Sequence, residues 1–157
     1  LRDASSQGHH GDFLTVGGMG NAGQIAAGIA MASPNRQIVC IDGDGAVLMH
    51  MGGLTNSADC KNLIHIVINN GAHDSVGGQP TASPNVDYVG LARATGYRCV
   101  ARAIDRNEVE NAVRQMVQEE GPCFLEVRVR KGARKDLGRP TSTPLANRND
   151  LMEGLLG

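Results

Sequence analysis

The chain has 157 residues, 41% of them hydrophobic, and a net charge of −1. This length accommodates one domain with a sizeable core, and the balanced charge argues against binding to nucleic acid or to a membrane surface. We expect no signal peptide and no transmembrane segment, because no apolar run approaches the roughly 20 residues that a bilayer requires.

The cysteines are widely spaced, and no C-x-x-C pair occurs among them. This spacing argues against a zinc or iron–sulfur site. Cys40 and Cys123 lie in apolar, strand-like runs, where a small buried hydrophobe is the expected role. We therefore expect a reducing, cytoplasmic compartment.

The first half of the chain is predicted to alternate between strand and helix. Ser33-Pro34-Asn35 ends the first helix. In chain order we predict a polar lead-in at 1–12, a strand at 13–16, a glycine loop at 17–20, a helix at 21–32, a strand at 37–42, a helix at 46–59 and a strand at 63–69.

The second half begins with a long loop at 70–85, rich in glycine and proline, of a kind that is usually functional or mobile. Asp105 and Glu108 have the spacing of a capping box. The predicted elements after the loop are a helix at 87–95, a strand at 97–101, a helix at 105–120, a strand at 123–130, a basic irregular tail at 131–143 and an amphipathic helix at 145–156.

This alternation predicts one α/β domain over residues 1–157, with a doubly wound, mainly parallel sheet and helices on both faces. Such sheets bind ligands at the carboxyl ends of their strands. The glycines, 21 of 157 residues, cluster at 17–28, 43–53 and 71–78, which are those ends.

A first glycine motif favours a dinucleotide site. Residues 18–23 match G-x-G-x-x-G, and Asp42 lies 19 residues beyond Gly23 at the end of the next strand. In a nicotinamide-binding domain the pyrophosphate would lie at the helix N-terminus and the acid would bind a ribose. A tight strand–helix turn explains the glycines equally well, so both interpretations stay open.

A second pattern favours a metal–diphosphate site. Asp44 follows one buried strand, and Asn69-Asn70 follows the next. Asp44 and Asn70 would bind Mg²⁺ together with a diphosphate, because this ion prefers a few oxygen ligands plus phosphate. The helix expected from Ala46 would present free N–H groups to the phosphates. A calcium loop is excluded, since Ala46 occupies the position of its third ligand.

These motifs, together with the runs 12–20, 69–81 and 130–141, resemble the phosphonopyruvate decarboxylase family of thiamine diphosphate enzymes over nearly the whole chain. The run 69–81 is the most discriminating. The resemblance implies a thiamine diphosphate-binding fold, thiamine diphosphate and Mg²⁺ as cofactors, and decarboxylation of 3-phosphonopyruvate to phosphonoacetaldehyde and CO₂.

The resemblance also implies roles for single residues. The metal ligands would be Asp44, Asn70 and the carbonyl of Ala72. Gly17 and Met19 would contact the aminopyrimidine through the backbone, and the Met19 side chain would hold the cofactor bent. The full set of implied cofactor-binding residues is Gly17, Gly18, Met19, Gly20, Gly43, Asp44, Gly45, Ala46, Asn70 and Ala72.

Three polar residues of the loop after Asn70, namely His73, Asp74 and Gln79, are candidates for substrate contact or proton delivery. A hydrogen-bonded loop is an equally good interpretation. His50 and His65, inside a predicted helix and strand, are interpreted as structural. The late basic run could bind a phosphonate or be a solvated tail; it comprises Arg128, Arg130, Lys131, Arg134, Lys135 and Arg139.

The resemblance implies a partner. The family activates its cofactor with a glutamate from a pyrimidine-binding domain, which this chain lacks, so we expect activity only with such a domain or subunit, in a homo- or hetero-oligomer. The glutamates of this chain are expected to lie away from the pocket; they are Glu108, Glu110, Glu119, Glu120, Glu126 and Glu153.

Other functions stay open. A sulfopyruvate decarboxylase beta-type subunit is the nearest alternative. A 2-oxoacid:ferredoxin oxidoreductase subunit would bring cluster-binding cysteines that are absent here. A nicotinamide dinucleotide-binding domain and a non-catalytic assembly subunit represent other classes.

Overall fold

The structure, a computed structural model, describes residues 11–132, 136 and 140–156. It contains two compact units. The larger spans Gly20–Ala133, and the smaller combines Leu1–Met19 with Arg134–Gly157. Among the described residues, none of the helices combines the length and the hydrophobicity of a membrane span. The expectations for residues 1–10 of the polar lead-in and for Arg134, Lys135 and Arg139 lie outside the described residues.

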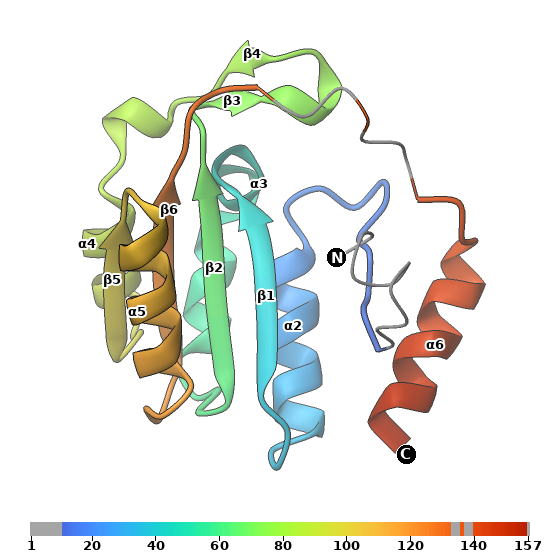
Figure 1. Cartoon of the computed structure of the whole chain (residues 1–157). Coiled ribbons are helices and arrows are strands. Elements are labelled where there is room, and N and C mark those ends of the chain that lie inside the picture. Colours follow the sequence, from blue (N-terminus) through green and yellow to red (C-terminus); the bar gives the residue numbers. More distant parts are fainter. Residues whose placement is uncertain (1–10, 133–135, 137–139, 157) are drawn as a thin grey trace. The chain divides into compact units, whose positions relative to one another are not determined.

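The larger unit is built on a four-stranded parallel sheet with the order β1-β2-β6-β5 (Figure 1). Its strands are β1 (Ile38–Gly43), β2 (Leu63–Asn69), β5 (Cys99–Ala103) and β6 (Cys123–Arg128). Gly43 is the register partner of Ile68, so β1 and β2 end side by side. This edge therefore receives the residues that follow both strands.

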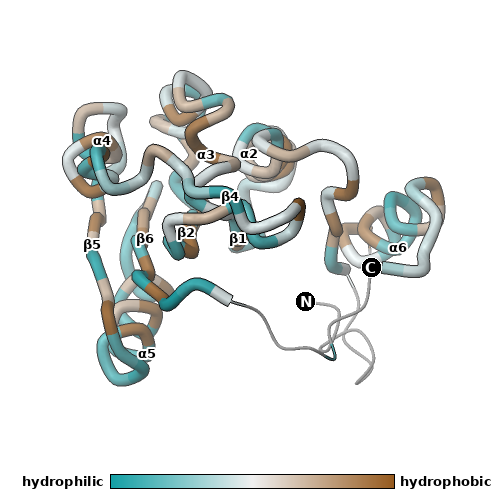
Figure 2. Tube along the Cα trace, turned by 90° about the horizontal axis from the view of Figure 1, so that it is seen from above, coloured by the Kyte–Doolittle hydropathy of each residue, from teal (hydrophilic) through white to brown (hydrophobic). Residues whose placement is uncertain are grey.

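Helices lie on both faces of this sheet (Figure 2). On one face are α2 (Ala22–Ala32), α3 (Asp44–Met49) and α4 (Tyr88–Ala94), and on the other is α5 (Arg106–Met116). The strands alternate accordingly: Phe124 packs in the core of the first face, whereas Leu125 packs in the core beneath α5. The predicted α/β fold with a parallel sheet is confirmed.

Most predicted elements of the larger unit are present, with shifted ends. β5 begins two residues later than the strand predicted from Tyr97, and α5 ends at Met116 rather than near Glu120. The expected cap of α5 is present, because the backbone N–H of Glu108 donates to Asp105 Oδ1 at 2.9 Å. The Glu108 carboxylate in turn accepts from the backbone N–H of Ile104 at 2.7 Å.

The single helix predicted at 46–59 is wrong. α3 already begins at Asp44 and ends at Met49, and a 3-10 helix, η1 (Met51–Ser57), follows it. Glycine is a poor α-helix former, and Gly53 is held closely by α2: a Cβ on this residue would lie 1.6 Å from Gln24 Nε2. The α-helix therefore ends ahead of Gly52 and Gly53, which lie within η1 and disfavour its continuation.

The loop predicted at 70–85 is an ordered hairpin. Two short strands, β3 (Ala72–His73) and β4 (Gln79–Pro80), pair antiparallel, and two 3-10 turns, η2 (Asp74–Val76) and η3 (Ser83–Asn85), complete the segment. The backbone N–H of Thr81 donates to the carbonyl of Gly71 at 3.0 Å, which closes the base of the hairpin.

The strand predicted at 13–16 is also wrong, since these residues of the smaller unit form no strand. The backbone of Leu14 is satisfied instead by a side chain: its N–H donates to Asn147 Oδ1 at 3.0 Å, and its carbonyl accepts from Asn147 Nδ2 at 2.9 Å. Asn147 lies in α6 (Pro144–Leu156), the predicted terminal helix. The expected amphipathic pattern is weak, because Leu145 and Leu156 are exposed.

Candidate cofactor-binding site

Asp44 occupies the first position after β1 and is the first residue of α3. It is 1% exposed. The hydroxyl of Thr81 donates to its Oδ2 at 2.6 Å, and the hydroxyl of Tyr88 donates to its backbone carbonyl at 3.1 Å. The carboxylate is therefore held in one orientation at the end of the strand.

Asn70 follows β2 and is fixed by both ends of its amide. Its Oδ1 accepts from the backbone N–H of Ala72 at 3.0 Å, and its Nδ2 donates to Asp74 Oδ2 at 2.8 Å. An amide oxygen has two lone pairs, so one backbone hydrogen bond leaves Asn70 Oδ1 able to bind a cation. The same asparagine orients Ala72, the third implied ligand.

Thr81 connects the two halves of the site. Its hydroxyl binds Asp44, and its backbone N–H binds the carbonyl of Gly71. The hairpin that carries Ala72 is thereby tied to the start of α3. Asp44 thus belongs to the same hydrogen-bonded cluster as the turn after Asn70.

The glycines at this edge differ in their surroundings. A Cβ on Gly43 or Gly71 would meet nothing within 4 Å. A Cβ on Gly45 would lie 2.3 Å from His73 Cε1 and 2.9 Å from a Thr81 methyl. Gly45 is therefore needed for the close packing of His73, whereas Gly43 and Gly71 border open space at the strand ends.

Glu126 is a component of this edge that the sequence did not reveal. It is fully buried in β6, and its carboxylate accepts from Asn69 Nδ2 at 2.8 Å, Arg102 Nε at 2.5 Å and Arg128 Nε at 3.1 Å. Burial raises its pKa, but these hydrogen bonds outweigh burial and hold the pKa of Glu126 below its usual value. The expectation that Glu126 lies away from the site is wrong, because β6 lies next to β2.

The hydrogen bonds of Glu126 hold the Asn69-Asn70 turn against the sheet. Asn69 Oδ1 accepts from the backbone N–H of Gly71 at 3.3 Å, while its Nδ2 is held by Glu126. The two asparagines therefore differ in role: Asn69 is turned toward the sheet, and Asn70 toward the hairpin. A carboxylate within an otherwise apolar strand, at 123–127, was the available signal in the sequence.

The three predicted catalytic residues occupy different environments in the hairpin. His73 packs on Gly45, and Asp74 Oδ2 accepts from Asn70 and, at 2.7 Å, from the backbone N–H of Gly132. Gln79 is exposed and close to Gly77, where a Cβ would lie 2.9 Å from its Nε2. The structure therefore brings His73 and Asp74 to the metal-site residues, and Gln79 is the exposed register partner of His73 on β4.

The start of the basic tail contacts the same hairpin. Lys131 Nζ donates to the carbonyl of Gly78, and Gly132 binds Asp74. Arg128 instead pairs with Glu126. Lys131 is therefore the basic side chain that the structure attaches to the loop.

The predicted aminopyrimidine loop is divided between the two units. Gly17, Gly18 and Met19 belong to the smaller unit, so their contacts with a cofactor stay predictions. Gly20 begins the larger unit with φ 88, a conformation suited to glycine. A Cβ there would lie 2.8 Å from His50 Nδ1.

Asp42 does not have the position that a ribose-binding acid requires. Its Oδ1 accepts from the backbone N–H of Gly43 at 2.9 Å, and its Oδ2 faces His65 Nε2 at 3.8 Å. The side chain is 8% exposed. Asp42 thus points into the sheet–helix interior, which weakens the dinucleotide interpretation.

The comparisons with known proteins bear on the family of the chain rather than on its single site residues. Residues 3–127 match the family described as thiamine pyrophosphate enzyme, C-terminal TPP binding domain. The phosphonopyruvate decarboxylase of Streptomyces viridochromogenes is 41% identical over 134 residues, which are 84% of this chain and 34% of that protein. The enzyme of the same name from Streptomyces hygroscopicus is 38% identical and covers 84% of this chain and 33% of its own length.

Two further relatives extend the comparison. Sulfopyruvate decarboxylase subunit beta of Methanothermobacter thermautotrophicus is 34% identical over 122 residues, 76% of this chain and 63% of that subunit. A solved structure described as a thiamin diphosphate-dependent enzyme from Mycobacterium smegmatis superposes with a TM-score of 0.65 at 25% identity, covering 74% of this chain and 23% of that one.

This chain therefore spans about a third of the phosphonopyruvate decarboxylases and under two thirds of the beta subunit. The family match, in contrast, covers most of the chain itself. The chain belongs to the family of C-terminal TPP-binding domains of thiamine pyrophosphate enzymes.

Proposed function

We propose that this chain is the diphosphate- and Mg²⁺-binding part of a decarboxylase that converts 3-phosphonopyruvate to phosphonoacetaldehyde and CO₂. The observation that carries the proposal is the cluster at the carboxyl ends of β1 and β2, where Thr81 joins the Asp44 carboxylate to the turn after Asn70. Relatives named phosphonopyruvate decarboxylase, at 41% and 38% identity, support the substrate.

The residues present fit a magnesium–diphosphate group. Asp44, Asn70 and the carbonyl of Ala72 are hard oxygen donors, which Mg²⁺ prefers when phosphate oxygens complete its coordination. Gly43 and Gly71 leave the neighbouring edge open. Bound there, thiamine diphosphate would supply the stabilisation of the carbanion that decarboxylation leaves.

The chain's own residues would position the group and handle protons. Thr81 orients the Asp44 carboxylate, and Asp74 orients Asn70 through its amide nitrogen. His73, which packs on Gly45, is the titratable side chain best placed to deliver a proton near the metal site. Asp74 is occupied by two hydrogen bonds and acts as a support.

The substrate's acidic group would meet the start of the basic tail. Lys131 lies against the hairpin at Gly78, so its ammonium is available next to the loop that follows the metal ligands. A phosphonate and a sulfonate are both bound by cations, so sulfopyruvate is the second candidate substrate. Similarity to a protein named subunit beta favours that alternative and a separate partner subunit.

The partner would be a pyrimidine-binding domain or subunit that supplies the activating glutamate.

The test of the proposed function has two steps. Calorimetry should show Mg²⁺-dependent binding of thiamine diphosphate by the chain and no binding of NAD. Turnover should then appear only after the partner is added, and faster with phosphonopyruvate than with sulfopyruvate. NAD binding without thiamine diphosphate binding would refute the proposal, and full turnover by the isolated chain would refute the need for a partner.

A further inference from the structure

A second cluster of chemically active side chains lies beneath the strand ends, inside the larger unit. Cys40 and Asp42 alternate along β1, and His65 on β2 is the register partner of Cys40. One ligand atom from each of these three residues, which we call the buried triad, lies within 4.8 Å of the others. The triad combines a thiol, a carboxylate and an imidazole.

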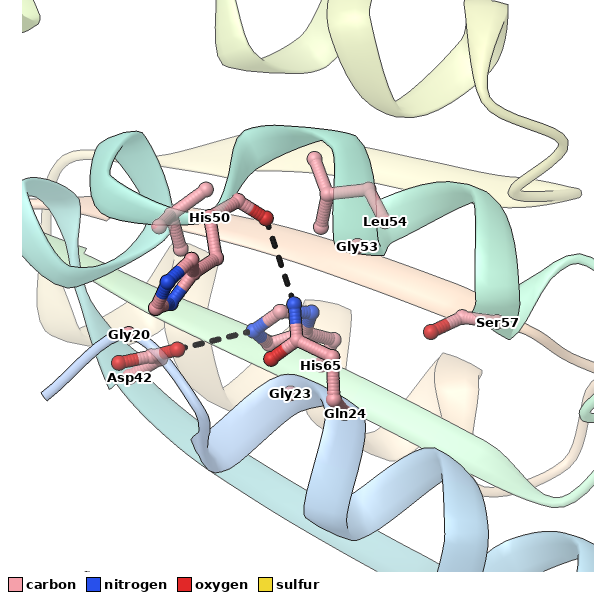
Figure 3. Close-up of a pocket in the computed structure, with 10 residues that line it drawn as sticks. Gly20, Gly23, Gln24, Asp42, His50, Gly53, Leu54, Ser57 and His65 are labelled. Carbon is pink, nitrogen blue, oxygen red and sulfur yellow. Dashed lines mark hydrogen bonds and ion pairs between the residues drawn. The ribbon is translucent and has the colours of Figure 1, made fainter. Parts of the chain in front are cut away.

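The imidazole of His65 is oriented toward a small cavity. Its Nδ1 lies 3.0 Å from the hydroxyl of Tyr97, and its ring packs edge-on against Phe124 with centroids 5.5 Å apart. Gly23 closes the opposite side, where a Cβ would lie 3.1 Å from His65 Cε1. These contacts leave Nε2 aimed at the cavity, with Asp42 facing it (Figure 3).

Two polar atoms of this cavity have no hydrogen-bond partner. They are His65 Nε2 and Gln24 Oε1, and no other buried side-chain nitrogen or oxygen in the described part of the chain lacks one. The distance from His65 Nε2 to Asp42 Oδ2, 3.8 Å, is too long for a hydrogen bond. Buried polar groups without partners are costly, so a bound species that contacts both atoms would satisfy them.

The charge of the cavity is also unbalanced. Asp42 is nearly buried, and His65 is its ion-pair neighbour. Within the part of the chain that the structure describes, no Lys or Arg forms an ion pair with Asp42. A buried carboxylate normally requires a paired cation. The two positive charges of a divalent cation would balance the negative charges of the Asp42 carboxylate and of a Cys40 thiolate.

We propose that Cys40, Asp42 and His65 bind one divalent transition-metal ion of the zinc type, with Gln24 Oε1 as the fourth ligand. Sulfur, nitrogen and oxygen ligands together suit Zn²⁺ in a tetrahedral site, whereas Mg²⁺ prefers oxygen ligands alone. A cavity of about 10 Å³, lined by Asp42, His65 and Gln24, lies beside the triad and admits one small ion. The Tyr97 hydroxyl would fix the ring of His65, as is usual for a metal-bound histidine.

Binding would require a small contraction and the loss of one proton. Zinc holds its ligands at about 2.0–2.3 Å, so the triad atoms would move closer together than they are in the structure. Burial and the neighbouring Asp42 carboxylate raise the pKa of the Cys40 thiol to about 12. The ion would displace this proton to solvent and form the metal–thiolate bond. The bound ion would brace β1 against β2 below Asp44 and Asn70.

The test is a Co²⁺ titration of the metal-free full chain, with excess Mg²⁺ present to occupy the Asp44 site. Cobalt replaces zinc and reports a thiolate ligand by charge-transfer absorption in the near ultraviolet. We expect one equivalent to bind with this band and added Zn²⁺ to bleach it. Cys40→Ser should abolish the band, and Tyr97→Phe should weaken Co²⁺ binding by about 10- to 100-fold while retaining the band.

Matched variants separate this site from other ligands. Cys60→Ser removes a second buried free cysteine of the same core cluster and should leave the band unchanged. The double variant His9→Gln/His10→Gln removes two adjacent histidines of the N-terminal lead-in and should also leave the band unchanged. Circular dichroism checks that each variant is folded. The proposal is overturned if the wild type shows no band, if the band survives Cys40→Ser, or if a crystal grown with Zn²⁺ holds only water in the cavity. None of these outcomes depends on whether the chain binds thiamine diphosphate.

Discussion

The side-chain amide of Asn69 donates a 2.8 Å hydrogen bond to the buried carboxylate of Glu126, across 57 positions of the sequence. Asn69 precedes the implied metal ligand Asn70, so this contact couples the central strand β6 to the cofactor edge. The same carboxylate binds Arg102 and Arg128. Glu126 is therefore a positioning residue for the turn that presents Asn70.

Glu126→Gln should weaken both the fold and the cofactor site. The substitution removes the negative charge that three donors share, and loss of one partner from a buried polar pair costs about 1–3 kcal/mol of the free energy of unfolding. Urea unfolding measures this loss, and calorimetry measures the accompanying loss of Mg²⁺-dependent thiamine diphosphate affinity. Glu110→Gln, at an exposed position of α5, is the matched control. Equal stability and affinity in both variants would contradict the assigned role.

The same carboxylate predicts a pH dependence of stability. The pKa of Glu126 is lower in the folded chain than its usual value, so ionised Glu126 stabilises the fold above the unfolded pKa of about 4.3. This stabilisation is lost as the pH falls through the folded pKa. Urea unfolding of the wild type should therefore show falling stability below about pH 4, and Glu126→Gln should reduce the slope. An unchanged slope in the variant would show that other carboxylates account for the acid sensitivity.

Thr81→Val should reduce Mg²⁺ affinity without removing a metal ligand. The Thr81 hydroxyl holds Asp44 Oδ2 at 2.6 Å, and loss of such an outer contact typically weakens metal binding by about 10- to 100-fold. Titration of Mg²⁺ in the presence of thiamine diphosphate measures the change. Thr95→Val removes a hydroxyl at the end of α4, whose partners are the carbonyls of Leu91 and Ala92, and should leave the affinity unchanged. Identical behaviour of both variants would show that Thr81 does not position Asp44.

Gly45→Ala should disrupt the contact between α3 and the hairpin. The added methyl would lie 2.3 Å from His73 Cε1, and overpacking of this kind costs about 1–3 kcal/mol. A double-mutant cycle with His73→Ala should recover most of the lost stability, because the shorter side chain removes the clash. Gly28→Ala, where a Cβ meets nothing within 4 Å in α2, should instead stabilise the chain by about 0.5–1 kcal/mol. If the effects of Gly45→Ala and His73→Ala on stability are additive, the lost stability does not come from a clash with His73.

Lys131→Ala should affect the substrate rather than the cofactor. Lys131 is attached to the hairpin at Gly78, and loss of a hydrogen bond to a charged group costs about 1.5–3 kcal/mol, or roughly 10- to 100-fold in KM. Steady-state kinetics with the pyrimidine-binding partner should show this rise with little change in kcat or in thiamine diphosphate affinity. Lys61→Ala, which removes an exposed ion pair with Glu120, is the control. An unchanged KM would favour a tail that takes no part in substrate binding.

The sequence by itself determined the fold class and the two principal metal-ligand candidates. Apolar runs of strand length that alternate with helical segments require a parallel sheet covered on both faces. Parallel strands end at a common edge, so Asp44 and Asn70 could be assigned to the same region from their position after β1 and β2 alone. These inferences needed only local periodicity and chain order.

Only the tertiary structure decided which side chains meet across the sheet. Glu126 accepts a hydrogen bond from Asn69, and His73 packs on Gly45. Gln24 packs on Gly53, inside the segment predicted to be a single helix at 46–59. The alignment of His65 beside Cys40 likewise depends on the register of β1 and β2. Strand order, register and close packing are set by the whole core, because many weak long-range contacts act together there, so no local pattern could have specified these pairs.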